Sequence, residues 1–142
     1  MNIRTAIVND SEKIIELMDQ LDYPNTEPFI RKRITQLLEH PDHKLLVYEL
    51  DNKVVACISI HYVPQLALKE DFAIISYLAV DNSVRSKGIG RELEEYCTQL
   101  AKERNCDRIQ VHCNIRREHA HRFYERQEFQ ESRKYFSKKI KY

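Results

Sequence analysis

Glycine is scarce in this chain of 142 residues, occurring only at Gly88 and Gly90, and tryptophan is absent. The four cysteines include no C-x-x-C pair, and the first residues, Met1–Arg4, show no signal-peptide pattern. No apolar run approaches the roughly 20 residues that a helix needs to span a bilayer. These absences predict a cytoplasmic protein with free thiols and without a membrane partner.

Composition and charge are those of a folded domain rather than a disordered segment, with 42% hydrophobic and 32% charged residues. The length suits a single domain over residues 1–142 with a core of its own. The formal net charge is only +1, so no overall field draws nucleic acid or an anionic membrane to the protein. Any site for an anion must therefore be local.

The spacing of apolar residues changes along the chain from a helical to a strand-like period. Asn9-Asp10-Ser11 can cap a first helix, and Thr26 can cap a second one that stops before His40. The expected first half is a strand over residues 3–8, these two helices, and a hairpin over 45–60 around the turn Asp51-Asn52-Lys53. The expected second half begins with a loop over 64–71 and a strand over 72–80 buried on both faces. A helix, a parallel strand over 108–113 and a helix over 118–127 follow. The end, over 129–140, is expected to be one strand or a broken pair, with Tyr135, Phe136 and Ile140 in the core.

Both glycines lie in the hexapeptide Arg85-Ser86-Lys87-Gly88-Ile89-Gly90, where an apolar strand gives way to a helix. The first N–H groups of a helix have no partner within it, and they lie at the positive end of the helix dipole. Such a helix start binds phosphates, and glycine lets a phosphate approach the backbone closely. Arg85, Lys87 and Arg91 add positive charge. An ordinary turn with solvated basic side chains is the alternative interpretation.

Three motifs taken together resemble the GNAT superfamily of acetyl-CoA-dependent N-acetyltransferases. They are Leu78-Ala79-Val80, Arg85-x-x-Gly88-x-Gly90 and, about thirty residues later, Ala120-x-x-Phe123-Tyr124-Glu125. The order of elements matches along nearly the whole chain. The resemblance implies an α/β fold: one GNAT-like domain with a mixed, mostly antiparallel twisted sheet flanked by about four helices.

The resemblance also implies a binding site for acetyl-CoA as co-substrate. In that superfamily the glycine turn holds the pyrophosphate of coenzyme A, and the preceding strand lends backbone groups to the pantetheine arm. The N–H of Val80, beside a bulge in the strand, is expected to polarise the thioester carbonyl. The implied cofactor-binding residues are Leu78, Ala79, Val80, Arg85, Ser86, Lys87, Gly88, Ile89, Gly90, Arg91 and Asn114.

By the same resemblance, Tyr124 is the general acid that protonates the departing thiolate. A free tyrosine has a pKa of about 10, which suits a thiolate better than a carboxylic acid would. The alternative is a Tyr124 ring that only packs under the sheet. The expected reaction is direct attack by a primary amine in a ternary complex, because no cysteine has an obvious activating partner in the sequence.

The acceptor side is less defined. The segment Arg117-x-x-Ala120-His121-x-Phe123-Tyr124 resembles a subgroup that includes aminoalkylphosphonate N-acetyltransferases, which favours a small-molecule amine and suggests that Arg116 or Arg117 contacts an anionic group of the acceptor. Three residues depart from the family pattern: Glu128 replaces a glycine, Arg117 an asparagine and Ile74 a glutamate found in some relatives. The general base stays open between a water relay and the side chains of Tyr77, His61, His112, Glu70 and Asp71.

Other functions stay open as well. They are a non-catalytic CoA-binding module, a protein acetyltransferase acting on lysines or N-termini, and a nucleic-acid-binding domain. The last is disfavoured because acidic residues nearly balance the basic ones and no basic patch is interleaved with aromatics. His112, His119 and His121 lack the spacing of a metal site, so no metal is predicted. Exposed strands and an apolar helix face are compatible with a homodimer.

Overall fold

The computed structural model describes residues 2–112, 117–132 and 135–141. In these residues the strands are β1 (Ile3–Thr5), β2 (His43–Leu50), β3 (Lys53–Val63), β4 (Phe72–Val80) and β5 (Ile109–Val111). The helices are α1 (Ser11–Gln20), α2 (Ile30–Glu39), α3 (Ile89–Glu103) and α4 (Glu118–Arg126). Two short 3₁₀ turns, η1 (Val8–Asp10) and η2 (Asn82–Val84), precede α1 and α3.

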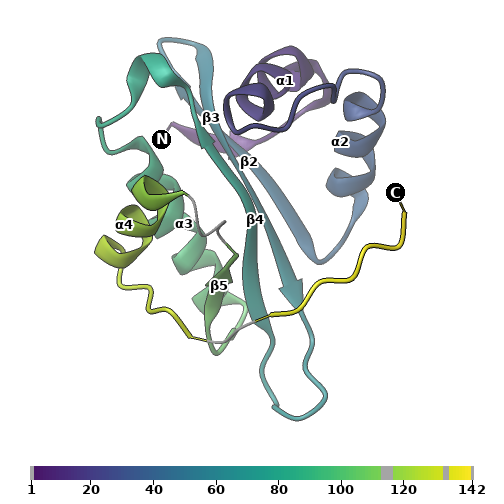
Figure 1. Ribbon diagram of the computed structural model, residues 1–142, viewed down its shortest axis with the longest axis vertical. Helices are drawn as coiled ribbons and strands as arrows, with labels where there is room; N and C mark the ends of the chain where they lie inside the picture. The colour runs from purple at the N-terminus through teal and green to yellow at the C-terminus, as the bar shows by residue number, and fades with distance from the viewer. Residues whose placement is uncertain (1, 113–116, 133–134, 142) are drawn as a thin grey trace. The chain divides into compact units, whose positions relative to one another are not determined.

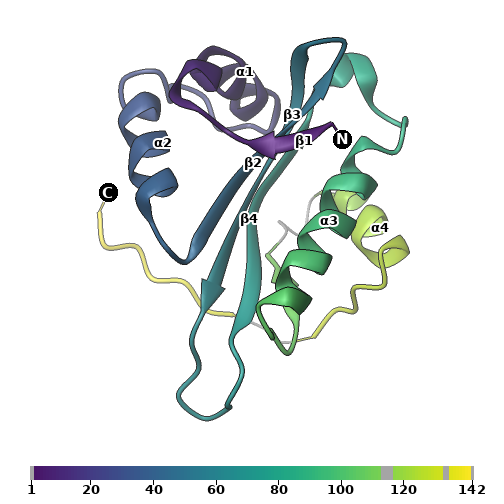
Figure 2. The same ribbon diagram turned by 180° about the vertical axis from the view of Figure 1, so that it is seen from behind.

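The strands form one sheet in the order β1-β2-β3-β4-β5. The first three pairs are antiparallel, and β4 pairs with β5 in parallel through the crossover helix α3. The predicted mixed, mostly antiparallel sheet with four helices is thus confirmed. The chain divides into two compact units, residues 1–112 and 113–142. Within the first unit, α1 and α2 cover one face of the sheet and α3 covers the other (Figures 1 and 2).

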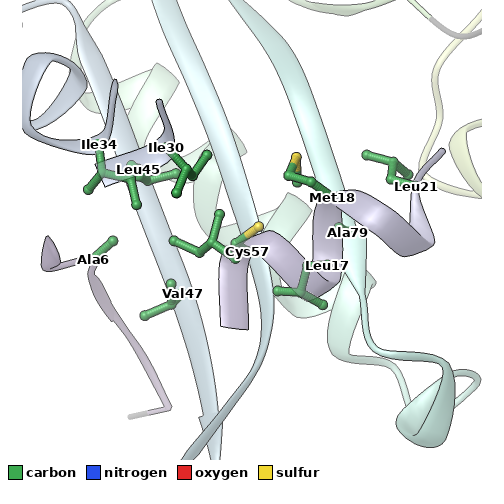
Figure 3. Close-up of a cluster of buried hydrophobic side chains, with 11 residues drawn as sticks. Ala6, Leu17, Met18, Leu21, Ile30, Ile34, Leu45, Val47, Cys57 and Ala79 are labelled. Carbon is green, nitrogen blue, oxygen red and sulfur yellow. The ribbon is translucent and has the colours of Figure 1, made fainter. Parts of the chain in front are cut away.

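The core beneath α1 and α2 follows from the helical spacing of apolar residues. Ile14, Leu17, Met18 and Leu21 recur at steps of three and four, which places them on one face of the α1 region. Figure 3 shows Leu17, Met18 and Leu21 over the strands of the sheet. The buried cluster consists of Ala6, Ile14, Leu17, Met18, Leu21, Ile30, Ile34, Leu45, Val47, Cys57 and Ala79. Through Ala79 this core anchors the strand that leads to the glycine turn.

The predicted hairpin is confirmed, with Asp51 and Asn52 joining β2 to β3 at φ 52° and 63°. Left-handed values at both positions are what a two-residue turn of this kind requires, and Asp and Asn tolerate them. The first strand is shorter than predicted, since it ends at Thr5 and a 3₁₀ turn follows. The second helix stops before His40, as expected.

Both predicted helix caps are wrong. The Asp10 side chain makes no capping bond to α1; its carboxylate instead accepts the Ile7 N–H at 2.8 Å and pairs with Arg4. The backbone carbonyl of Thr26 accepts the N–H groups of Phe29 and Ile30. The Thr26 hydroxyl is buried and has no hydrogen-bond partner among the described residues. As a result α2 begins at Ile30.

The strand predicted over residues 129–140 is wrong for the residues described there. Residues 129–132 and 135–141 form neither helix nor strand. Tyr135, Phe136 and Ile140, expected in the core, are 63%, 94% and 81% exposed. Tyr135 and Phe136 are adjacent, so in a strand they would point to opposite faces, and the basic residues around them leave no one-sided apolar pattern.

Candidate active site

The candidate site begins where β4 ends, at a turn held by Asp81. Its carboxylate accepts the Ser83 N–H at 2.9 Å and the Ser83 hydroxyl at 2.7 Å. The ammonium of Lys13 on α1 forms an ion pair with the same carboxylate. The Lys13 ammonium and the Ser83 hydrogen bonds hold the pKa of Asp81 well below its usual range. The exit of β4 is therefore fixed to α1.

A β-bulge interrupts β4 at Ser76. Ser59 of β3 faces Tyr77 while Ile60 faces Ile75, so Ser76 is the extra residue. The bulge expected beside Val80 is thus present but lies further back along the strand. Ser76 and Tyr77 are exposed, so the prediction of a strand buried on both faces is wrong in the middle of β4. Beyond the bulge, Ala79 is buried between half-buried neighbours.

Gly88 opens α3 in the left-handed conformation, with φ 81° and ψ 8°. A Cβ built on Gly88 would lie 3.6 Å from Nη2 of Arg91, an ordinary contact, so the need for glycine is conformational rather than steric. The helix that follows runs for 15 residues. The N–H groups of its first turn lack partners within the helix, which provides the donors that a phosphate group needs.

Three exposed basic side chains, Arg85, Lys87 and Arg91, stand around this turn. Nε of Arg85 donates to the carbonyl oxygen of Val80 at 3.3 Å, which folds the side chain back over the end of the strand. Among the described residues, no carboxylate forms an ion pair with any of the three. The turn therefore keeps the positive charge expected of a phosphate site.

The expected cofactor residues from Leu78 to Arg91 thus lie on one continuous strand, turn and helix start. Within this stretch Ile89 is buried and anchors the first turn of α3, whereas Ser86 is exposed and left-handed, with φ 67°. Asn114 and Arg116 lie outside the described residues. Arg117 precedes α4 and is half-buried.

Tyr124 lies on α4, in the second unit, and is half-buried. Its ring packs edge-on against Phe123, with centroids 5.1 Å apart, and against Phe129 at 5.4 Å. The helix closes in a Schellman motif: the Phe129 N–H donates to the Tyr124 carbonyl at 2.9 Å, and the Glu128 N–H donates to the Glu125 carbonyl at 3.0 Å. Glu128, which replaces the usual glycine, takes φ 69°. The role of Tyr124 in the reaction stays a prediction.

The five candidate bases do not gather at the exit of β4. In the strand register His61 faces Ile74, near the start of β4, where Glu70 and Asp71 also lie, whereas Val80 faces Ala56 at the other end. His112 follows β5. Of the five, Tyr77 is the one that adjoins Leu78. Its ring packs edge-on against Tyr23 at 5.3 Å, which brings the α1–α2 connector against β4.

An acidic cavity of about 660 Å³ beside α1 was missed by the sequence analysis. Its described lining is Ile15, Asp19, Asp22, Pro24, Asn25, Thr26 and Glu27, with no basic residue. α1 also ends in a Schellman motif, in which Asp22 takes φ 70° and the Tyr23 N–H donates to the Met18 carbonyl at 2.8 Å. The signal that could have found the cavity is the concentration of acidic residues around this helix end.

The described cysteines are unsuited to covalent catalysis. Burial raises the pKa of the Cys57 and Cys97 thiols to about 12, so both stay protonated at neutral pH. Burial also raises the pKa of Cys106, while Cys113 lies outside the described residues.

In the described part of the chain, no three His, Cys, Asp or Glu side chains are grouped so that they could hold a metal ion. None of the helices described has the length and apolar character needed to cross a membrane.

Known proteins share both the sequence pattern and the fold of this chain. It is 27% identical over 143 residues to the aminoalkylphosphonate N-acetyltransferase of Salmonella typhimurium, with 97% of this chain and 90% of that protein covered. The fold is similar to that of a transcriptional regulator from Bacillus halodurans C-125, with a TM-score of 0.88, 24% identity, and 97% of this chain and 98% of that chain covered. It is also similar to an aminoglycoside acetyltransferase from an uncultured soil metagenomic sample in complex with sisomicin, with a TM-score of 0.83, 23% identity, and 98% and 95% covered.

A family model described as "Acetyltransferase (GNAT) family" matches residues 12–129. The matched span contains β4, the glycine turn, α3 and Tyr124, which are the parts of the chain that carried the sequence resemblance. It also extends across both compact units. With most of its length matched in this way, the chain belongs to the GNAT family of acetyltransferases.

Proposed function

We propose that this chain is an N-acetyltransferase that moves the acetyl group of acetyl-CoA to a primary amine of a small molecule in a ternary complex. The observation that carries the proposal is Gly88, left-handed at the start of α3 and surrounded by basic side chains that pair with no carboxylate of the described residues. In a member of this family, such a helix start has the donors and the charge to hold the pyrophosphate of coenzyme A. We further propose that residues 1–142 act as one cytoplasmic domain without a nucleic-acid or membrane partner; a homodimer stays a prediction.

In the proposed reaction, the neutral amine nitrogen forms a bond to the thioester carbonyl carbon, the carbon–sulfur bond breaks, and sulfur leaves with the bonding electrons. The Tyr124 hydroxyl gives its proton to that sulfur, and the proton of the former amine passes to water or a base. The N–H of Val80 stabilises the oxyanion that forms between these steps. The raised thiol pKa values of Cys57 and Cys97 support direct transfer over an acyl-cysteine intermediate.

The cofactor site is tested by thermal melts of wild type, Gly88→Glu and Gly88→Gln with and without acetyl-CoA. A ligand that binds only the native state raises the free energy of unfolding, by about 2.7 kcal/mol at one hundred times its Kd, and the melting midpoint rises with it. We expect a clear rise in wild type and none in Gly88→Glu, whose carboxylate stands where the phosphates bind. Gly88→Gln has the same strained backbone without the charge, so it should keep part of the rise. No rise in wild type at saturating acetyl-CoA would refute the acetyltransferase proposal.

The role of Tyr124 is tested by Tyr124→Phe, which keeps the ring contacts with Phe123 and Phe129 and removes only the hydroxyl. We expect kcat to fall about a hundredfold, the scale of general acid catalysis, while acetyl-CoA still raises the melting midpoint. Tyr135→Phe, at an exposed tyrosine, is the matched control and should retain wild-type kcat. An unchanged kcat in Tyr124→Phe would assign the proton to another donor.

A further inference from the structure

Glu92 is the acidic residue in the first turn of α3, beside the proposed phosphate site. The residue is exposed, and its N–H donates to the Gly88 carbonyl at 3.0 Å. Two anions close together repel each other, so a carboxylate next to bound phosphates lowers their affinity. The place at which the Glu92 carboxylate is held therefore affects how well this helix start binds a phosphate.

A Glu92 side chain without restraint would move into the proposed site. Side chains of a helix point back toward its N-terminus, so a freely rotating carboxylate at this position reaches the turn that begins at Gly88. The unpaired N–H groups and the positive end of the helix dipole attract a carboxylate there as they attract a phosphate. The basic side chains of Arg85, Lys87 and Arg91 act in the same direction. An unrestrained Glu92 would thus compete with the cofactor for the same donors.

The hydroxyl of Tyr48 holds this carboxylate elsewhere. Oη of Tyr48, on β2 and 44 residues away in the chain, donates to Oε2 of Glu92 at 2.8 Å. Among the described residues, Glu92 forms no ion pair with a basic side chain, although Arg91 is its neighbour in the sequence. The carboxylate is therefore tied to β2 and not to the basic side chains at the helix start.

Tyr48 is itself fixed in place. Val47 belongs to the core beneath α1 and α2, so the next residue, Tyr48, points to the other face of the sheet, which α3 covers (Figure 2). Tyr48 is 5% exposed, and its Oη accepts a hydrogen bond from Nδ2 of Asn2 at 3.0 Å. Asn2 is held in turn, because its carbonyl accepts the Glu49 N–H at 2.8 Å. With the oxygen of the hydroxyl paired to Asn2, its one proton is directed to Glu92.

We propose that Tyr48 is a positioning residue of the cofactor site, which holds the Glu92 carboxylate away from the start of α3 and keeps the N–H groups there open for phosphate. This inference rests on the proposed acetyltransferase function. In this role Tyr48 acts through Glu92 and makes no contact with the cofactor. Removal of its hydroxyl should therefore weaken the binding of coenzyme A only while a carboxylate is present at position 92.

The test is calorimetry with coenzyme A on wild type, Tyr48→Phe, Glu92→Gln and the double variant. Tyr48→Phe keeps the buried ring and releases the carboxylate, so we expect Kd to rise about tenfold. Glu92→Gln keeps an oxygen that can accept from Tyr48 and removes the charge, so its Kd should equal or fall below that of wild type. The double variant should return to the Kd of Glu92→Gln, because no carboxylate is left to compete.

Two further measurements separate this role from a purely structural one. The double variant Tyr48→Phe with Glu95→Gln is the matched control, since Glu95 is exposed on α3 beyond its first turn, and it should keep the tenfold loss. Added salt should reduce the ratio of Kd values between Tyr48→Phe and wild type, because the competition is electrostatic. A loss that neither Glu92→Gln nor salt relieves would overturn the proposal, and so would an unchanged Kd in Tyr48→Phe.

Glu92→Asp tests the same contact while leaving Tyr48 intact, which matters if Tyr48→Phe does not fold. Aspartate keeps the charge but is one methylene shorter, so its carboxylate loses the hydrogen bond to Tyr48. We expect Kd for coenzyme A to rise in Glu92→Asp and not in Glu92→Gln; equal values would overturn the proposal. If wild type does not bind coenzyme A, the acetyltransferase proposal fails and this one with it. If all variants bind it as wild type does, only the role of Tyr48 fails.

Discussion

His43 is a buried titratable residue at the start of β2. Its Nε2 lies 2.7 Å from the Ser59 hydroxyl, and its ring centroid lies 4.4 Å from that of His61. Burial, followed by the charge of His61, lowers its pKa from 6.5 to about 4. The His43 side chain therefore stays neutral in the folded protein over a range of pH in which the unfolded chain takes up a proton.

We expect this histidine to make the protein acid-sensitive between pH 6.5 and about 4. In this window the unfolded chain binds more protons than the folded one, so the free energy of unfolding falls as the pH falls. The loss is about 1.4 kcal/mol per pH unit and on the order of 3 kcal/mol across the window. Burial also lowers the pKa of His61, which acts in the same direction. Urea unfolding at a series of pH values measures the slope.

The control for this prediction is His43→Gln, which cannot take up a proton and can still reach the Ser59 hydroxyl. Its free energy of unfolding should depend less on pH in the same window. Because the pKa of Asp81 is lowered, its contribution to the free energy of unfolding is lost only at lower pH. It therefore does not affect the comparison of His43→Gln with wild type. An identical slope in the variant would show that His43 is not the group responsible.

At the scale of elements, three of the helices in the described residues end on a left-handed residue other than glycine. These are Asp22 after α1 with φ 70°, Asn105 after α3 with φ 60°, and Glu128 after α4 with φ 69°. The hydrogen bonds after each helix follow the Schellman pattern. Asn and Asp tolerate this conformation through short polar side chains, but a glutamate has no such advantage. Glu128 is the least favourable of the three.

We therefore expect Glu128→Gly to stabilise the protein by about 1 kcal/mol, because it removes the steric cost of the left-handed backbone. For a chain of this size the melting midpoint should rise by about 2–4 °C. Glu125→Gly, in the last turn of the same helix where the backbone is right-handed, is the matched control and should lower the free energy of unfolding. If both changes lower the midpoint, the backbone at position 128 is not under strain.

For the molecule as a whole, the sequence predicted several elements with strong local signals, although the two helix caps, which are also local, were wrong. The glycine turn, the β4–α3–β5 crossover and the hairpin were all predictable, because turn residues and apolar spacing act over a few neighbouring residues. The cofactor residues proposed from Leu78 to Arg91 came from the family resemblance, and they lie on one continuous strand, turn and helix start. Their binding of acetyl-CoA stays a prediction until it is measured.

What the sequence did not predict depends on segments far apart in the chain. The position of the bulge at Ser76 is set by pairing with β3, and the acidic cavity forms only when the connector folds against α1. The burial of His43 likewise requires the register of two strands. The apolar residues near the C-terminus misled the prediction, since local hydrophobicity does not say whether a packing partner exists.

The restriction of glycine to the start of α3 also has a spectroscopic consequence. The sequence contains only two glycines, so protein produced with isotopically labelled glycine carries the label only at Gly88 and Gly90. The other described left-handed positions use Asp, Asn, Ser or Glu. A nitrogen–proton correlation spectrum would then contain two backbone signals, both from the proposed phosphate site. Titration with coenzyme A fragments could follow that site without assigning the rest of the protein.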